Sequence, residues 1–180
     1  MTKKDKIIQI AKKHFAKKSY DNTTLDDIAK EVGVTKPALY HHFKNKNEIY
    51  NEIFIKSFSK LNITNVKNIK EYINVLADFF EKDENITYLF SKELSCGANN
   101  LTENSIKVLS KTILKLQELL KNTGINPFLL QTIIMTTLVN YKNTIRIRQK
   151  VAKVTNIDPN IKGIKDELYW MINKYIEEYK

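Results

Sequence analysis

The stretch TLDDIAKEVGVTKPALYHHFKNK, residues 24–46, decides the fold of this chain. It opens with Thr24 and two acids, which is typical of a helix start, because hydroxyl and carboxylate oxygens accept from the free amides of the first turn. Apolar residues then recur at helical spacing until Gly33, where a tight turn requires a left-handed backbone. The stretch therefore predicts a short amphipathic helix that ends in a glycine turn.

A second short helix is predicted directly after this turn. Thr35 is its expected cap, and Pro37 falls in the first turn, where a missing amide proton costs little. Leu39 and Phe43 lie four residues apart and are expected to face the core. The remaining side chains offer cations, hydrogen-bond donors and small apolar groups, which suit the major groove of DNA. These outward residues are Lys36, Pro37, Ala38, Tyr40, His41 and Lys44.

A third helix is predicted to begin after Asn45, with Glu48 closing a capping box. Lys44 and Lys46 flank that start. Two lysines beside free backbone amides form an anion site, which here means a phosphate of the DNA backbone.

The order of these residues resembles the DNA-binding domain of the TetR (TetR/AcrR-type) family of bacterial transcriptional regulators. The resemblance runs from about residue 7 to about residue 58 and is densest over TTLDDIAKEVGVTKPALYHHFKNKNEIY. It implies that residues 36–38 read base edges and that Tyr40, His42 and Lys46 contact the DNA backbone. Ser19 departs from the family, which usually has glycine there, so its turn is expected to be slightly strained. The full predicted DNA-contacting set is Thr24, Thr35, Lys36, Pro37, Ala38, Tyr40, His41, His42, Lys44 and Lys46.

The composition supports an all-α, nucleic-acid-binding protein. Only four glycines and three prolines interrupt apolar spacings of three and four residues, which favours helices throughout. The net charge of +10 favours a polyanionic partner, and +6 of it lies in the first 60 residues. Lysine outnumbers arginine 28 to 2, which also reflects the codon supply of an AT-rich genome.

The rest of the chain divides into a connecting helix and a C-terminal domain. A first helix over residues 3–18 places His14 on an apolar face, where it is expected to be a hydrogen-bonded core histidine. The predicted domains are 1–46 for the helix-turn-helix, with a connecting helix over 47–61, and 62–180 for effector binding and dimerisation, the boundary being the polar stretch 62–68.

Two long helices near the C-terminus are expected to form a dimer interface. One begins at Asn126 and Pro127 and keeps an apolar face as far as Ile145, and the last is capped by Asp158 and Pro159. The resemblance implies that such helices pair with those of a second subunit in a four-helix bundle, whereas a single larger monomeric core is the alternative. The predicted interface is Leu130, Ile134, Leu138, Leu168, Met171, Ile172 and Tyr175.

The resemblance also implies a small-molecule effector pocket among the helices from about 69 to 145. A mostly apolar pocket with a few hydroxyls favours a hydrophobic or aromatic effector. Residue by residue, ordinary core is the favoured interpretation of each candidate, because aromatic residues at helical spacing fill cores first. The candidates are Tyr72, Phe80, Tyr88, Phe90, Cys96 and Tyr141.

Catalysis, a metal and a cofactor are not expected. His41 and His42 point about 100 degrees apart on a helix and cannot easily share one ion. No histidine follows residue 42, and no phosphate-binding loop or nucleophile motif occurs. A single cysteine excludes an intrachain disulfide and indicates a reducing cytoplasm, and the most apolar run is too short to span a membrane.

These observations predict a cytoplasmic bacterial homodimer that binds a palindromic double-stranded operator. It would act as a repressor that a small-molecule effector releases from DNA. Three alternatives stay open: a helical ligand-binding protein without specific DNA recognition, a transcriptional activator of the same fold, and a helical enzyme.

Overall fold

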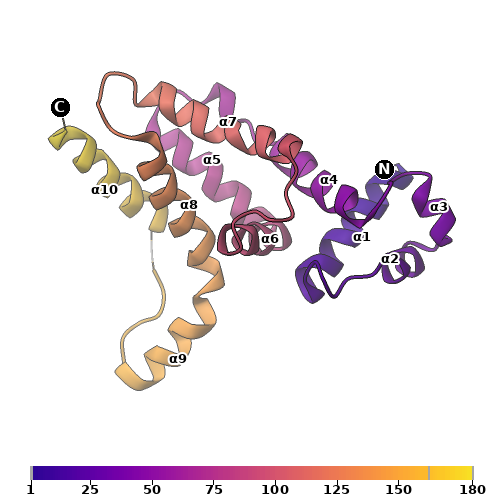
Figure 1. Cartoon of the computed structure of the whole chain (residues 1–180). Helices are drawn as coiled ribbons and strands as arrows, with labels where there is room; N and C mark the ends of the chain where they lie inside the picture. Colours follow the sequence, from indigo (N-terminus) through magenta and orange to yellow (C-terminus); the bar gives the residue numbers. More distant parts are fainter. Residues whose placement is uncertain (1, 162, 180) are drawn as a thin grey trace. The chain divides into compact units, whose positions relative to one another are not determined.

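The computed structural model describes residues 2–161 and 163–179, and every regular element in these residues is helical (Figure 1). The all-α prediction is therefore confirmed. The α-helices are α1 (Lys3–Lys18), α2 (Leu25–Val32), α3 (Lys36–Tyr40), α4 (Lys46–Phe58), α5 (Ile69–Lys82), α6 (Glu84–Ser95), α7 (Glu103–Leu119), α8 (Pro127–Asn143), α9 (Ile145–Thr155) and α10 (Ile164–Glu178), with a 3-10 helix at Ile63–Asn65.

The helices form two compact units that do not follow the order of the chain. The first unit contains the chain up to Lys60 together with Asp83–Leu109, so that α6 and the beginning of α7 belong with the N-terminal helices. The second unit contains Leu61–Lys82 and the chain from Ser110 onward. The predicted functional division at residue 62 stays a prediction.

In the first unit, α1 packs against α2, α4 and α6. Its buried face consists of Ile7, Ile8, Ala11 and Phe15, whereas Ile10, which the sequence placed on this face, is only half-buried. The ring of Phe15 meets that of Tyr50 on α4 edge to face, with centroids 5.0 Å apart. These apolar contacts provide the support on which α2 and α3 rest.

A buried polar network fixes the segment between α6 and α7 onto α4. The Asn51 carboxamide oxygen accepts from the amide of Thr102 (2.7 Å) and the hydroxyl of Ser105 (2.6 Å), and its nitrogen donates to the carbonyl of Asn100 (2.9 Å). The Tyr50 hydroxyl donates to the buried carboxylate of Glu93 at 2.7 Å. Burial, together with this hydrogen bond, raises the pKa of Tyr50 above its ordinary value. Because buried polar groups need partners, the network specifies one position for this segment.

In the second unit, α5 packs against α8 and α10. The buried residues of these helices are Tyr72, Ile73, Leu76, Ala77 and Phe80 on α5, Leu130, Ile134, Met135, Leu138 and Val139 on α8, and Leu168, Ile172 and Ile176 on α10.

Two sequence-based predictions about the C-terminal helices are wrong. The long helix ends at Asn143 and does not continue through Ile145. In an unbroken helix the amide of residue 145 would donate to the carbonyl of Tyr141, but here the Arg148 guanidinium donates to that carbonyl (2.6 Å). Asp158 and Pro159 do not cap the last helix, since Asp158 instead accepts from the amide of Asn160 (2.9 Å) and closes a turn. The last helix, α10, begins only after Gly163, which has a φ of +66°.

Candidate nucleic-acid interface

The turn between α2 and α3 has the predicted construction. The hydroxyl of Thr24 accepts from the amide of Asp27 at 3.1 Å and caps α2. Gly33 has a φ of +79°, and its amide donates to the carbonyls of Ala29 and Lys30. The left-handed glycine closes the last turn of α2 and redirects the chain into α3.

α3 presents one face to the core and the other to solvent. The Thr35 hydroxyl accepts from the amide of Ala38 at 3.3 Å, and Leu39 and Phe43 are fully buried as predicted. Of the residues expected to face outward, Ala38 is half-buried, as is His42. The others are exposed, namely Lys36, Pro37, Tyr40, His41 and Lys44. The buried pair thus anchors a helix whose opposite face is free to meet a ligand.

Acids of α2 hold two lysines beside this face. The Lys36 ammonium lies 2.7 Å from a carboxylate oxygen of Asp26, and Lys18 lies 2.9 Å from Asp27. The hydrogen bond with Asp26 raises the pKa of Lys36, and the hydrogen bond from Lys18 lowers the pKa of Asp27. Lys36 is therefore charged at neutral pH, and Asp27 is ionised. The pairing of Lys36 with Asp26 was not predicted from the sequence, although opposite charges flank the glycine turn.

The two lysines at the start of α4 differ in their environment. Asn45 caps α4 by accepting from the amide of Glu48 at 2.8 Å. The Glu48 carboxylate accepts from the Lys44 amide (2.6 Å), one residue before the amide that a capping box uses. The Lys44 side chain is exposed. The Lys46 ammonium donates to the carbonyl of Tyr20 (2.9 Å) and lies 4.4 Å from the centre of that ring.

The sequence also makes predictions for two other residues of the first unit, His14 and Ser19. His14 is 2.6 Å from the Glu31 carboxylate, so it is hydrogen-bonded as predicted, but it is half-buried and not part of the core. Ser19 has φ and ψ of +73° and 170°, a region that is almost restricted to glycine. The expected strain in this turn is therefore present.

The candidate effector residues are divided between the two compact units, and their role stays a prediction. Tyr88, Phe90 and Cys96 belong to the first unit, and Tyr72, Phe80 and Tyr141 belong to the second. Tyr88 and Cys96 are exposed, and Tyr141 is half-buried. Phe80, Phe90 and Tyr72 are buried; the Tyr72 hydroxyl bonds the side chain of Gln131 and the carbonyl of Thr112. Burial raises the pKa of Tyr72.

Most of the predicted dimer residues are buried within the second unit itself. Leu130, Ile134, Leu138, Leu168 and Ile172 are at most 5% exposed, Tyr175 is half-buried, and Met171 is 50% exposed. Besides Met171, the large apolar side chains that α8 and α10 present to solvent are Phe128, Leu129, Ile133 and Trp170.

A membrane-spanning helix and a metal centre have no candidate among the residues that the structure describes. Over residues 2–161 and 163–179, no helix is both long and apolar enough to cross a membrane. The same residues contain no group of three or more His, Cys, Asp or Glu side chains placed to hold a metal ion.

The α2–turn–α3 geometry and the exposed face of α3 define a helix-turn-helix DNA-binding protein. Comparison with known proteins agrees. The family model described as "Bacterial regulatory proteins, tetR family" matches residues 7–53. The biofilm operon icaADBC HTH-type negative transcriptional regulator IcaR of Staphylococcus aureus (strain Newman) is 30% identical over 191 residues, covering 97% of this chain and all of that protein. IcaR of Staphylococcus epidermidis is 38% identical over 85 residues, 47% of this chain and 38% of that protein.

Solved structures share the fold. A transcriptional regulator of Streptomyces coelicolor, SCO4942, superposes with a TM-score of 0.71 at 18% identity, over 97% of this chain and 98% of that one. FadR of Bacillus subtilis, solved in complex with stearoyl-CoA, gives 0.65 at 18% identity, over 91% and 96%. The chain belongs to the TetR family of bacterial regulatory proteins and is a DNA-binding transcriptional regulator.

Proposed function

We propose that this regulator is a homodimeric repressor that binds a palindromic operator through α3 and is released by a small-molecule effector. The observation that carries the DNA-binding part is the division of α3 into a buried anchor, Leu39 and Phe43, and an exposed face of cations, donors and a proline. The S. aureus and S. epidermidis relatives are named negative regulators, which supports repression over activation.

The residues of the interface divide into two roles. Lys36, Pro37 and Ala38, at the start of α3, would face base edges in the major groove. Phosphates would be contacted by Tyr40, His41, His42 and Lys44. The hydroxyls of Thr24 and Thr35 would contact phosphates as well, because each accepts a hydrogen bond from one amide and still has a proton to donate. Lys46 would contribute charge while its bond to Tyr20 holds it beside the interface.

A second subunit would place a second α3 on the DNA. Since Leu130 and Ile134 are used inside the unit, the interface would consist of the apolar side chains that α8 and α10 leave in solvent, above all Phe128, Trp170 and Met171. The two reading helices must then lie about one turn of DNA apart, roughly 34 Å, or a multiple of that distance.

The effector would bind among the helices of the second unit. The polar cluster of Tyr72, Gln131 and Thr112 lies where α5, α7 and α8 meet, inside otherwise apolar helices. A few polar groups in an apolar surrounding fit a hydrophobic ligand with one polar end. Such a ligand can release DNA only if it binds more tightly to a conformation in which the two α3 helices have the wrong spacing than to the DNA-binding conformation.

The test of the residue roles compares two lysines of the face. Lys44→Ala should weaken binding to all DNA sequences and lower the slope of log K against log salt by about one contact. Lys36→Ala should instead change the preference at particular base pairs. Equal loss on specific and random DNA for both variants would contradict the assignment, and weak binding without preference in the wild type would favour a ligand-binding protein that does not read DNA.

A further inference from the structure

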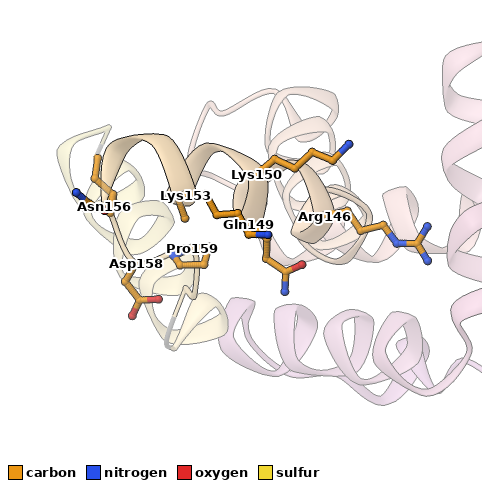
Figure 2. Close-up of a pocket in the computed structure, with 9 residues that line it drawn as sticks. Arg146, Gln149, Lys150, Lys153, Asn156, Asp158 and Pro159 are labelled. Carbon is orange, nitrogen blue, oxygen red and sulfur yellow. The ribbon is translucent and has the colours of Figure 1, made fainter.

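α9 and the loop after it enclose a groove that the proposed DNA interface and effector site do not use. Among its described residues α9 has no buried one, although it is eleven residues long. The groove has a volume of about 850 Å³ and lies between the helix, from Arg146, and the loop, as far as Pro159 (Figure 2). This volume falls within the range of roughly 300–1,000 Å³ that small-molecule sites occupy.

Two residues behind the groove hold the loop in place. Arg148 donates to the carbonyls of Tyr141 (2.6 Å) and Pro159 (3.1 Å), and its guanidinium lies over the ring of Tyr141 at 4.9 Å. The Tyr141 hydroxyl donates to the carbonyl of Ile161 at 3.1 Å. The far wall of the groove is therefore tied to the end of α8 by side chains rather than left as a free loop.

The cations of the groove have no partners within the described part of the chain. Arg146, Lys150 and Lys153 recur at i, i+4 and i+7 on α9, and no hydrogen bond or ion pair engages their side chains. The groove's carboxylate, Asp158, already accepts from the amide and the side chain of Asn160, both at 2.9 Å. The groove thus has an unneutralised positive charge.

The two ends of the groove differ in their balance of charge. Figure 2 shows Arg146 and Lys150 extending from one end, while Lys153, Pro159 and Asp158 lie toward the other. Ile157 and Pro159, directly before and after Asp158 in the chain, supply apolar lining, as does Ala152 on α9. An anionic group is favoured at the Arg146 end, where two cations lie without a carboxylate, over the other end, where Asp158 offsets Lys153; this difference sets the direction in which a ligand would lie. Arg146 is one of only two arginines in a chain with 28 lysines, and its planar fork suits phosphate and carboxylate.

We propose that this groove binds a soluble amphipathic organic anion, with its phosphate or carboxylate head at Arg146 and Lys150 and its aliphatic body against Ile157 and Pro159. The site is separate from the proposed effector site, and its test does not require DNA.

Calorimetric titration of the full-length protein with monomeric octyl phosphate tests the proposal, with inorganic phosphate and octyl glucoside as probes of the head and the body alone. Octyl phosphate should bind at least tenfold more tightly than either probe, and more weakly as salt is raised. The double variant Arg146→Gln/Lys150→Gln should lose at least tenfold in affinity. Lys111→Gln/Lys121→Gln, which removes two exposed positive charges outside the groove, should bind like the wild type.

A second variant separates loss of the site from loss of the helix. Ile157→Ser leaves the charges of α9 intact. It should weaken the binding of octyl phosphate without changing the affinity for inorganic phosphate. Equal affinity of both double variants for octyl phosphate would overturn the proposal. So would binding to vesicles of anionic lipid without binding to the monomeric probe, because the surface would then be a membrane contact.

Discussion

At the scale of single residues, Lys36 and Asp26 form the contact on which DNA binding would act most directly. Their exposed ion pair spans the turn between α2 and α3, at 2.7 Å. Exposed pairs contribute little to stability, because solvent screens them and ordering the side chains costs entropy. The Asp26 carboxylate would therefore matter mainly as a competitor that Lys36 has to leave in order to reach DNA.

Asp26→Asn should consequently tighten DNA binding by a few-fold on every sequence at low salt, with the gain shrinking as salt is raised. Fluorescence anisotropy with labelled duplexes measures this change in DNA affinity. Asp21→Asn is the matched control, since it removes the same charge from an exposed residue of the same unit that has no ion pair with a described residue. The same gain in both variants would mean that general repulsion, and not the Lys36 pair, is responsible.

Ser19 predicts a stabilising substitution. Its φ of +73° with ψ of 170° costs roughly 1 to 3 kcal/mol for a residue with a side chain, and glycine removes most of that cost. Ser19→Gly should raise the urea midpoint of unfolding measured by circular dichroism, although it loses an exposed bond to Asn22.

Ser59→Gly serves as the control for Ser19→Gly. Ser59 ends α4 with ordinary right-handed angles, so glycine there relieves nothing and should leave stability unchanged or lower. A midpoint that falls in the Ser19 variant would show that the turn is not strained.

The structural roles of the helix-turn-helix residues were predictable because the interactions that determine these roles are local. A cap, a left-handed glycine and an apolar pair four residues apart each depend on neighbours in sequence, and Thr24, Gly33, Thr35 and Leu39 all have the predicted role in the fold. The pairing of Lys36 with Asp26 depends on how the turn folds back, which spacing alone does not fix.

At the scale of elements, α4 is held by side chains as well as by its apolar face. Asn51 is 3% exposed and bonds the amide of Thr102, the hydroxyl of Ser105 and the carbonyl of Asn100. Removal of its carboxamide leaves buried donors and acceptors without partners, each at a cost of roughly 1 to 3 kcal/mol.

Asn51→Ala should therefore destabilise the first unit by at least about 2 kcal/mol, measured by urea unfolding and by faster hydrogen exchange around Thr102. Asn104→Ala, at an exposed position on α7, should change neither quantity. If the two variants unfold alike, the network does not hold α7 to α4.

Helix starts were easier to predict than helix ends in the C-terminal part. Asn126 and Pro127 begin α8 as expected, because the cap is local. The break before α9 is set by Arg148, whose side chain reaches back to Tyr141 and across to Pro159. The apolar spacing continues through this break, so the spacing did not indicate that α8 ends there.

At the scale of the whole molecule, the proposed dimer depends on apolar surface that the second unit leaves in solvent. Trp170 is 59% exposed, Met171 50% and Phe128 67%. Apolar periodicity predicted both helices but could not separate the face that packs on α5 from the face that stays in solvent. For this reason the predicted list holds residues such as Leu130 and Leu168, which are buried within the unit.

Trp170→Glu should give a monomer in sedimentation at micromolar concentration, since a buried, unpaired carboxylate is costly in an apolar interface. The variant should bind an operator half-site normally and lose the tight binding to the full palindrome. Val154→Glu is the control, because Val154 is exposed on α9 and outside the proposed interface. A Trp170→Glu protein that remains dimeric would place the interface elsewhere.

The central claim is that this regulator reads a specific DNA sequence through α3. The most direct measurement is fluorescence anisotropy of the purified protein with the DNA upstream of its own gene and with a scrambled duplex, across a salt series. The account predicts a preference of about a thousandfold or more and a steep salt dependence. Equal, weak binding to both duplexes, together with no enriched sequence in a genome-wide selection of bound fragments, would contradict it.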